Sequence, residues 1–265
     1  MAFCKFDFHY SFTGNANQPL ILFLHGFMGD SHEFNPVISL LSEQFSCLTV
    51  DLPGHGKTRV LGGEECYTMV NTAQGLIDWL DELNIKRCIL VGYSMGGRLA
   101  LYLSLHYPER FSKVVLESAS PGLKTQQERV ERIQRDFELA RKLENTDFST
   151  FLSNWYNQPL FTSLTQHPNF DAVIDSRLQN KPIELAKSLR NLSIGCQPSL
   201  WDKLQESTTS LLLLVGEYDA KFIAINSEMV KLCKFTKLEI VHNCGHNIHA
   251  ENSKLFVEYI LEFLT

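Results

Sequence analysis

The sequence feature that most constrains this chain is an apolar run that meets a Gly-x-Ser-x-Gly motif and continues as a helix. Residues 88–91 have the pattern of a buried strand, the motif runs from Gly92 to Gly96, and residues 99–103 continue as a helix. A strand that turns so sharply into a helix holds the central residue, Ser94, in strained backbone geometry. Glycine suits the flanking positions because a Cβ there would crowd the turn. The pattern predicts an exposed nucleophilic serine, and a tight structural turn is the alternative.

Composition narrows the partners that this chain could have. With 44% hydrophobic residues, its 265 residues can form one large α/β domain or two small ones. The net charge of −6 argues against nucleic acid, which binds clustered Lys and Arg side chains. The first residues lack the apolar region of a signal peptide, and the apolar run at 211–215 is far too short to span a bilayer. We therefore expect a cytoplasmic protein with no nucleic-acid partner and no membrane insertion.

Cysteine and histidine spacing gives no sign of a metal site. The seven cysteines are scattered without a Cys-x-x-Cys pair, so reduced thiols are favoured over a disulfide framework. His242, His246 and His249 lie close in sequence but lack the paired ligand spacing of a zinc site. We expect no metal and no cofactor.

The order of the predicted strands and helices indicates an α/β fold. Strands are expected at residues 3–10, 20–24, 46–50, 88–91, 113–119, 211–215 and 238–241, with a turn-rich segment at 13–17. Helices are expected at residues 34–43, 68–83 and 253–264. This alternation predicts a mostly parallel central sheet covered by helices on both faces.

A long polar segment interrupts this alternation. Residues 123–200 read as helical, with arginines interspersed with Trp155 and Tyr156, before strand character returns. A helical insertion between two sheet strands, downstream of the serine, predicts a lid over the active site. We therefore expect a core of residues 1–122 and 201–265, with the lid 123–200 inserted after the sixth strand. The positive and negative charges of the lid nearly cancel, so an anion-binding site there would depend on a few individual arginines.

Two residues downstream of Ser94 complete a candidate catalytic triad. Asp219 follows the strand at 211–215, and His246 lies in the loop after the last strand. A serine hydroxyl is inert unless a base takes its proton, and histidine, with a pKa of about 6.5, can accept and return it while a carboxylate fixes its tautomer. Asp51 and His55 lie before the serine in the chain, whereas a serine at such a strand-to-helix turn is followed by its Asp and then its His. Asp51 and His55 are therefore interpreted as residues that shape a turn.

A strand that ends in His-Gly predicts one half of an oxyanion hole. The buried strand at 20–24 runs directly into His25 and Gly26, and acyl-transfer hydrolases place a backbone donor just after such a glycine. That donor is the Phe27 N–H, with the Met95 N–H as its partner. His25 itself is interpreted as bracing the loop.

Motifs around the triad narrow this interpretation. The chain closely resembles the 2-succinyl-6-hydroxy-2,4-cyclohexadiene-1-carboxylate synthase family, pyruvate-eliminating enzymes of menaquinone and phylloquinone biosynthesis with an α/β-hydrolase fold. The resemblance covers nearly the whole chain and is carried by residues 23–30, 50–56, 91–98, 121–123, 128–129, 131–132, 154–159, 161, 163–164, 216–222, 245–247, 249 and 251–252. The motifs in the lid are more specific than the serine motif, because general esterases have no reason to carry them.

The resemblance implies a lyase reaction in which the Ser–His pair removes a proton from a cyclohexene ring. Pyruvate then leaves 2-succinyl-5-enolpyruvyl-6-hydroxy-3-cyclohexene-1-carboxylate, giving 2-succinyl-6-hydroxy-2,4-cyclohexadiene-1-carboxylate. It further implies that Arg98, Arg132 and Arg177 bind the carboxylates of this small anionic substrate. Tyr93 and Trp155 match aromatic residues that line the site of the family.

One observation from the residues themselves agrees with an anionic substrate. Arg98 lies four residues after Ser94, so on a helix it occupies the same face, about one turn away. A guanidinium there is an odd choice for a fatty ester. Two other functions stay open: a serine hydrolase of small esters or carbon–carbon bonds, and a ligand-sensing receptor on the same fold. The oligomeric state is also open.

Overall fold

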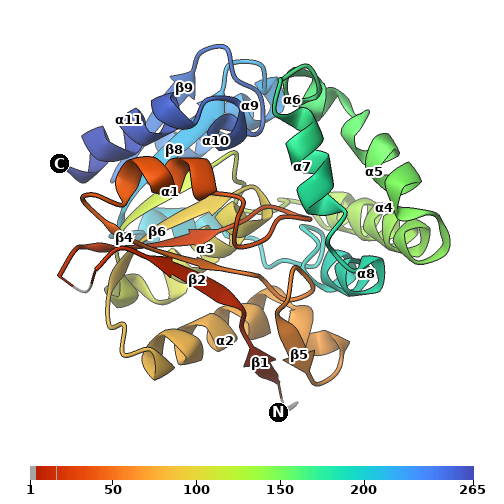
Figure 1. Cartoon of the computed structure of the whole chain (residues 1–265). Helices are drawn as coiled ribbons and strands as arrows, with labels where there is room; N and C mark the ends of the chain where they lie inside the picture. The colour runs from red at the N-terminus through yellow and green to blue at the C-terminus, as the bar shows by residue number, and fades with distance from the viewer. Residues whose placement is uncertain (1–3, 16) are drawn as a thin grey trace.

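The computed structural model describes residues 4–15 and 17–265 and has a central sheet covered by helices on both faces (Figure 1). In this part of the chain the main sheet has seven strands in the order β2-β4-β3-β6-β7-β8-β9. β2 is antiparallel to β4, and every other neighbouring pair is parallel. The strands are β2 (Tyr10–Thr13), β3 (Leu20–Leu24), β4 (Ser46–Val50), β6 (Cys88–Tyr93), β7 (Phe111–Glu117), β8 (Ser210–Gly216) and β9 (Thr236–Val241). The predicted α/β-hydrolase architecture is confirmed.

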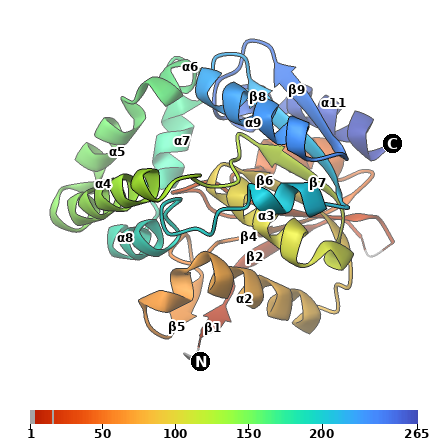
Figure 2. The same ribbon diagram turned by 180° about the vertical axis from the view of Figure 1, so that it is seen from behind.

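Alternating strand residues form two cores, one on each face of the sheet. On β3, Leu22 and Leu24 face one core, whereas Ile21 and Phe23 face the other. The first core includes α2 (Met69–Glu82), α3 (Met95–His106) and α9 (Ala220–Leu232), and the second includes α1 (Asn35–Leu41) and α11 (Ser253–Leu264). Figure 1 shows α1 and α11 in front of the sheet, and Figure 2 shows α3 and α9 on the opposite face. β6 and β8 are buried on both sides, which explains the continuous apolar runs at 88–91 and 211–215.

A helical insertion, α4 to α8, separates β7 from β8. It comprises α4 (Gln126–Asn145), α5 (Phe148–Tyr156), α6 (Thr162–Thr165), α7 (Phe170–Arg177) and α8 (Pro182–Asn191). Figures 1 and 2 both show α4, α5, α7 and α8 gathered at one end of the sheet. Apolar side chains of these helices form a third core with Met28, which follows β3. The insertion therefore packs onto the loop after β3, and its action as a lid stays a prediction.

The insertion follows the seventh strand of the described residues, so its predicted position after the sixth strand is wrong. The predicted strand 3–10 is divided into β1 (Lys5–Asp7) and β2, and β5 (Arg59–Leu61) was not predicted. β5 pairs with β1 in a separate two-stranded sheet, and its short sequence has no buried alternation. Phe3 and Ala16, which the predicted strand 3–10 and turn 13–17 include, lie outside the described residues.

A disulfide corrects the expectation that the cysteines are reduced thiols. Pairing of β1 with β5 brings Cys4 and Cys66 together, with their Cα atoms 5.4 Å apart, although 62 residues separate them in sequence. The remaining cysteines are free: Cys47, Cys88, Cys196, Cys233 and Cys244. Disulfides are rare in the cytoplasm, so the predicted compartment stays a prediction.

Short helices complete the connections between these elements: η1 (Glu64–Tyr67), η2 (Pro108–Arg110), η3 (Pro159–Phe161), η4 (Asp202–Glu206) and α10 (Ile248–Glu251). Parallel strands all end at the same edge of a sheet, so the loops after β3, β6, β7, β8 and β9 meet there. Among the described residues, no helix combines the length and low charge that crossing a bilayer requires.

Candidate active site

Ser94 lies in the sharp turn between β6 and α3. Its backbone has φ 49° and ψ −103°, a conformation that non-glycine residues rarely adopt. Gly96 allows α3 to pack against the end of β3, because a Cβ there would lie 2.2 Å from the carbonyl oxygen of Leu24. The Ser94 N–H donates to the carbonyl of Glu117 on β7 at 2.9 Å. The sequence motif thus produces a strained serine held by the neighbouring strand.

His246 connects this serine to Asp219. Its Nε2 lies 3.0 Å from Ser94 Oγ, and its Nδ1 lies 2.6 Å from Asp219 Oδ2. Asp219 also caps the N-terminus of α9, where its other carboxylate oxygen accepts the Phe222 N–H at 3.2 Å. With Nδ1–H donated to the carboxylate, Nε2 is free to accept the serine proton. The structure therefore places the three predicted triad residues in one hydrogen-bonded line.

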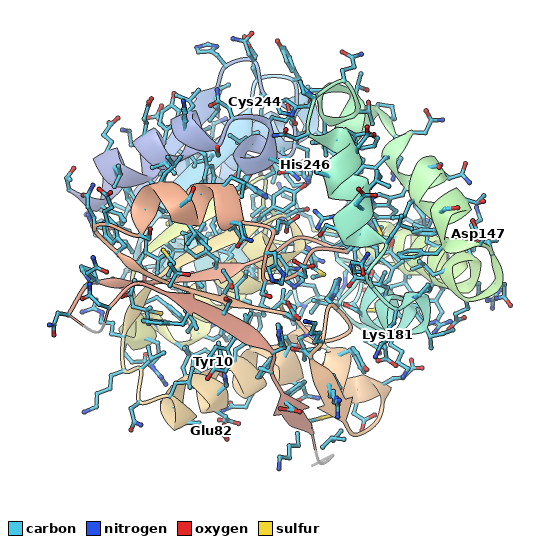
Figure 3. All side chains as sticks on the ribbon, in the orientation of Figure 1. Tyr10, Glu82, Asp147, Lys181, Cys244 and His246 are labelled. Atoms are coloured by element: carbon cyan, nitrogen blue, oxygen red, sulfur yellow. A yellow bond between two sulfur atoms is a disulfide. The ribbon has the colours of Figure 1, made fainter. Side chains whose placement is uncertain are left out.

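The imidazole of His246 is almost fully enclosed, with 3% of its side chain exposed. Figure 3 shows His246 where α10 meets the helical insertion. Three aromatic rings surround it, those of Tyr93, Phe161 and Phe222. The Gly245 N–H, one residue before it, donates to Glu251 at 2.9 Å. Packing and this hydrogen bond together fix the loop that carries the histidine.

The two predicted oxyanion-hole donors lie at the ends of neighbouring strands. Phe27 follows β3, and Met95 is the first residue of α3. Neither N–H has a hydrogen-bond acceptor within the described residues. The loop at Phe27 is fixed by the adjacent Gly26 N–H, which donates to Glu33 at 2.8 Å, and by His25, whose Nε2 accepts the Leu52 N–H at 2.9 Å. His25 thus braces the loop, and both N–H groups are available to a developing negative charge.

A cavity of about 640 Å³ lies between this edge of the sheet and the helical insertion. The predicted site residues among its lining are Phe27, Ser94, Met95, Arg98, Arg132, Trp155 and His246. The structure thus brings the serine and histidine of the candidate triad, both candidate donors, two arginines and one aromatic residue to one space, whereas Asp219 lies behind His246, outside the lining. Trp155 packs against Phe27, with ring centroids 5.3 Å apart.

Arg98 is a cation whose hydrogen-bond partners are neutral. Its guanidinium donates to Gln197 Oε1 at 2.6 Å and to the Leu192 carbonyl at 2.9 Å. Burial, together with the positive charge of Arg132, lowers the pKa of Arg98 to about 10, so the guanidinium remains charged at neutral pH. A buried charge without a counterion is costly, and an anionic ligand in the cavity would offset that cost.

Arg132, in contrast, already has a carboxylate partner. Its Nε lies 2.8 Å from Asp136 Oδ1, and the second oxygen of Asp136 accepts the Ser193 hydroxyl at 2.6 Å. One third of the Arg132 side chain remains exposed, at 33%. Arg132 therefore faces the cavity with part of its charge offset by a fixed acid.

Comparison with known proteins agrees with this geometry. A family model described as alpha/beta hydrolase fold matches residues 19–253. A 2-succinyl-6-hydroxy-2,4-cyclohexadiene-1-carboxylate synthase from Salmonella arizonae is 36% identical over 256 residues, which cover 95% of this chain and 96% of that protein. This chain belongs to that synthase family. A Bacillus subtilis protein, provisionally named with the same activity, is 39% identical over 95% of this chain and 92% of its own length. The structure of MenH from S. aureus superimposes with a TM-score of 0.92, at 35% identity and 97% coverage of both chains.

Two residues that the resemblance to this synthase family assigns to the substrate lie outside the cavity lining. Arg177 forms a buried ion pair with Glu33 and donates to the Tyr156 hydroxyl at 3.2 Å. Burial alone would raise the pKa of Glu33, but the charge of Arg177 holds it at about 2. Tyr93 is also buried, with its ring against Gly26 and His246, and burial raises its pKa well above the ordinary value.

Sequence reasoning missed three further cations that line the cavity: Lys124, Arg135 and Lys221. Lys124 pairs with Glu228, whereas Arg135 and Lys221 have no carboxylate within ion-pair distance in the described part of the chain. Lys221 is exposed as a residue, but partial burial of its ammonium group and the charges of Arg132 and Arg135 lower its pKa. Spacing could have revealed two of the three: Lys221 is two residues after Asp219, and Arg135 is one helical turn after Arg132. Among the described residues, no group of three or more His, Cys, Asp or Glu side chains is placed to hold a metal ion.

Proposed function

We propose that this member of the synthase family is a lyase that eliminates pyruvate from 2-succinyl-5-enolpyruvyl-6-hydroxy-3-cyclohexene-1-carboxylate. The observation that carries the proposal is the hydrogen-bonded line of Ser94, His246 and Asp219 at a cavity with an excess of positive charge. The product is 2-succinyl-6-hydroxy-2,4-cyclohexadiene-1-carboxylate, an intermediate of quinone biosynthesis.

Charge in the cavity supports an anionic substrate. The protein as a whole has a net charge of −6. The cavity lining nevertheless carries more cations than acids, with Arg98, Lys124, Arg132, Arg135 and Lys221 against Glu128, Asp136 and Glu228. The proposed substrate has three carboxylates, which the excess cations attract and orient. A neutral ester would gain nothing from them.

The triad supplies a base for this elimination. The ring carbon next to the succinyl ketone carries an acidic proton, which passes to the Ser94 oxygen as His246 Nε2 takes the hydroxyl proton. The resulting negative charge spreads onto the ketone oxygen, where the Phe27 and Met95 N–H groups stabilise it. The electrons then form the ring diene as the bond to the enolpyruvyl oxygen breaks. Pyruvate enolate leaves and is protonated to pyruvate, and Asp219 stabilises the protonated histidine meanwhile.

Residues 123–200 support this reaction as a lid. They contribute Arg132 and Trp155 to the cavity, opposite the loops of the sheet that carry the triad. Exclusion of water above the reacting ring strengthens the electrostatic interactions inside the cavity. The lid therefore serves both to bind carboxylates and to close the site.

The decisive test is pyruvate release from the proposed substrate. Purified protein should release one pyruvate per diene formed, measured by coupling to lactate dehydrogenase and by the absorbance of the diene. Ser94→Ala serves as the matched control and should be almost inactive. Intact-mass analysis of rapidly quenched enzyme should show unmodified protein, because Ser94 relays a proton and forms no bond to carbon. A stable adduct on Ser94, or turnover of neutral p-nitrophenyl esters without pyruvate release, would instead support a serine hydrolase.

A further inference from the structure

A second buried carboxylate–imidazole pair lies next to the triad and plays no part in the proton transfer described above. Glu117 is the last residue of β7, and neither its side chain nor its backbone is exposed to solvent. Its Oε2 lies 2.7 Å from His249 Nδ1, and its Oε1 accepts the His249 N–H at 3.0 Å. The three residues before it on β7, 114–116, are apolar and fully buried, so this glutamate ends a buried apolar run with a charged group.

Glu117 contacts both halves of the catalytic machinery. Its backbone carbonyl accepts the Ser94 N–H at 2.9 Å and thus holds the nucleophile at the strained turn. Its carboxylate holds His249 in the first turn of α10, three residues after His246. One residue therefore links the strand-to-helix turn of the serine to the loop of the histidine.

His249 is immobilised and has no path to the substrate. Its imidazole is 1% exposed and does not line the cavity. Three rings pack around it, those of Phe34, Tyr93 and Phe256, with centroid distances of 4.4, 4.9 and 5.9 Å. A side chain in this position does not exchange protons with a ligand in the cavity, but it transmits the position of Glu117 to the histidine loop.

We propose that Glu117, acting through His249, is a positioning residue that sets the distance between Ser94 and His246. A carboxylate is needed because the backbone N–H and the Nδ1–H of His249 both donate to this side chain, and each of its two oxygens accepts one of them. A glutamine at this position offers one acceptor and places its NH2 group against the other donor. The proposal rests on the proposed function, in which His246 acts as the base through Ser94.

The first test compares Glu117→Gln with the wild type. A displacement of about 1 Å in a catalytic group costs about a hundredfold in rate, so we expect kcat to fall ten- to a hundredfold. KM should change less than twofold, because the carboxylate-binding arginines are untouched. Ile260→Ala removes a buried side chain of the same core on α11, outside both catalytic loops in the chain, and it should lower stability while leaving kcat unchanged.

A matched pair at His249 keeps the proposal testable if Glu117→Gln does not fold. His249→Asn retains an N–H near the position of Nδ1 and should keep kcat within about threefold of the wild type. His249→Leu lacks this donor and should lose activity as Glu117→Gln does. Equal loss in both variants would overturn the positioning role of the hydrogen bond.

A substrate-free readout separates this proposal from the proposed function. The proton between His246 and Asp219 should give a downfield NMR resonance, assigned by its loss in His246→Gln. In Glu117→Gln that resonance should broaden and move upfield, and in His249→Asn it should persist. An unchanged resonance together with a kcat within twofold of the wild type in folded Glu117→Gln would refute the proposal. Absence of pyruvate release by the wild-type protein would refute the proposed function alone.

Discussion

Replacing Glu33 with glutamine tests whether the ion pair with Arg177 stabilises the fold. Both side chains are almost completely buried, 3% and 5% exposed, and they join the loop after β3 to α7 of the insertion. Burial opposes the charge of Glu33, but Arg177 and the Gly26 N–H hold its pKa at about 2, against 4.5 for the free side chain. A change of one pKa unit corresponds to about 1.4 kcal/mol, so the carboxylate contributes about 3 kcal/mol to stability at neutral pH.

The sign of the pH dependence follows from the lowered pKa. A group with a lower pKa in the folded state stabilises the fold fully above its unfolded value, here 4.5. That contribution is lost as the pH falls from 4.5 towards 2, and about 2 kcal/mol of it remains at pH 3.5. Glutamine at position 33 carries no charge and leaves Arg177 unpaired, so the variant lacks this contribution at every pH.

Urea unfolding followed by circular dichroism measures this difference directly. At pH 7 we expect the free energy of unfolding of Glu33→Gln to be about 3 kcal/mol lower than that of the wild type. The loss can reach about 5 kcal/mol, because the buried guanidinium of Arg177 also loses its partner. At pH 3.5 the difference between the two proteins should shrink by about 1 kcal/mol. A double variant, Glu33→Gln with Arg177→Met, should recover part of the loss. A difference below about 1 kcal/mol at pH 7, or one that does not change with pH, contradicts the assigned role of the pair.

Four further outcomes are expected. Ser94→Ala should lower the rate of pyruvate release about a thousandfold or more, because triad members act as a unit, and the lactate dehydrogenase assay measures it. Arg98→Ala should lower kcat/KM about ten- to a hundredfold through the loss of a charge-assisted hydrogen bond of about 1.5–3 kcal/mol, and Arg98→Lys should restore it only in part. Lys221→Met should raise KM about two- to fivefold, since an exposed cation contributes only about 0.2–1 kcal/mol, and added salt should diminish the effect. Reduction of Cys4–Cys66 should lower the free energy of unfolding by about 2–4 kcal/mol, measured in urea with and without reductant.

Local sequence patterns predicted the buried strands of the sheet and the helices that pack against it. The strand Ser46–Val50 and the helix Ser253–Leu264 have the predicted bounds, and the turn at Ser94 follows directly from its two glycines. These elements are predictable because each carries its signal in consecutive residues. The triad order could be predicted for a related reason, since parallel strands bring their following loops to one edge.

Interactions between distant residues could not be predicted in the same way. β5 is a three-residue strand whose outer residues are exposed, so it has no hydrophobic period, and the disulfide depends on its pairing with β1. The partner of Arg177 is Glu33, 144 residues away, and nothing near either residue indicates the pairing. The spacing of Lys221 from Asp219 and of Arg135 from Arg132 places both near the site, but only the cavity that they line distinguishes them from ordinary surface charges.

The groups that perform the chemistry and those that select the substrate are held in different ways. Three glutamates fix the loops around Ser94 by accepting backbone N–H groups: Glu33 from Gly26, Glu117 from His249 and Glu251 from Gly245. Each of these donating N–H groups lies within three residues of Phe27 or His246. A carboxylate that is costly to bury in isolation thus keeps a loop at the precision that proton transfer needs. The cavity cations, in contrast, are divided between the insertion and the first turns of α3 and α9, and several are half-exposed. Substitutions among these cations should therefore change which carboxylates are bound, while the proton-transfer geometry set by the glutamates persists.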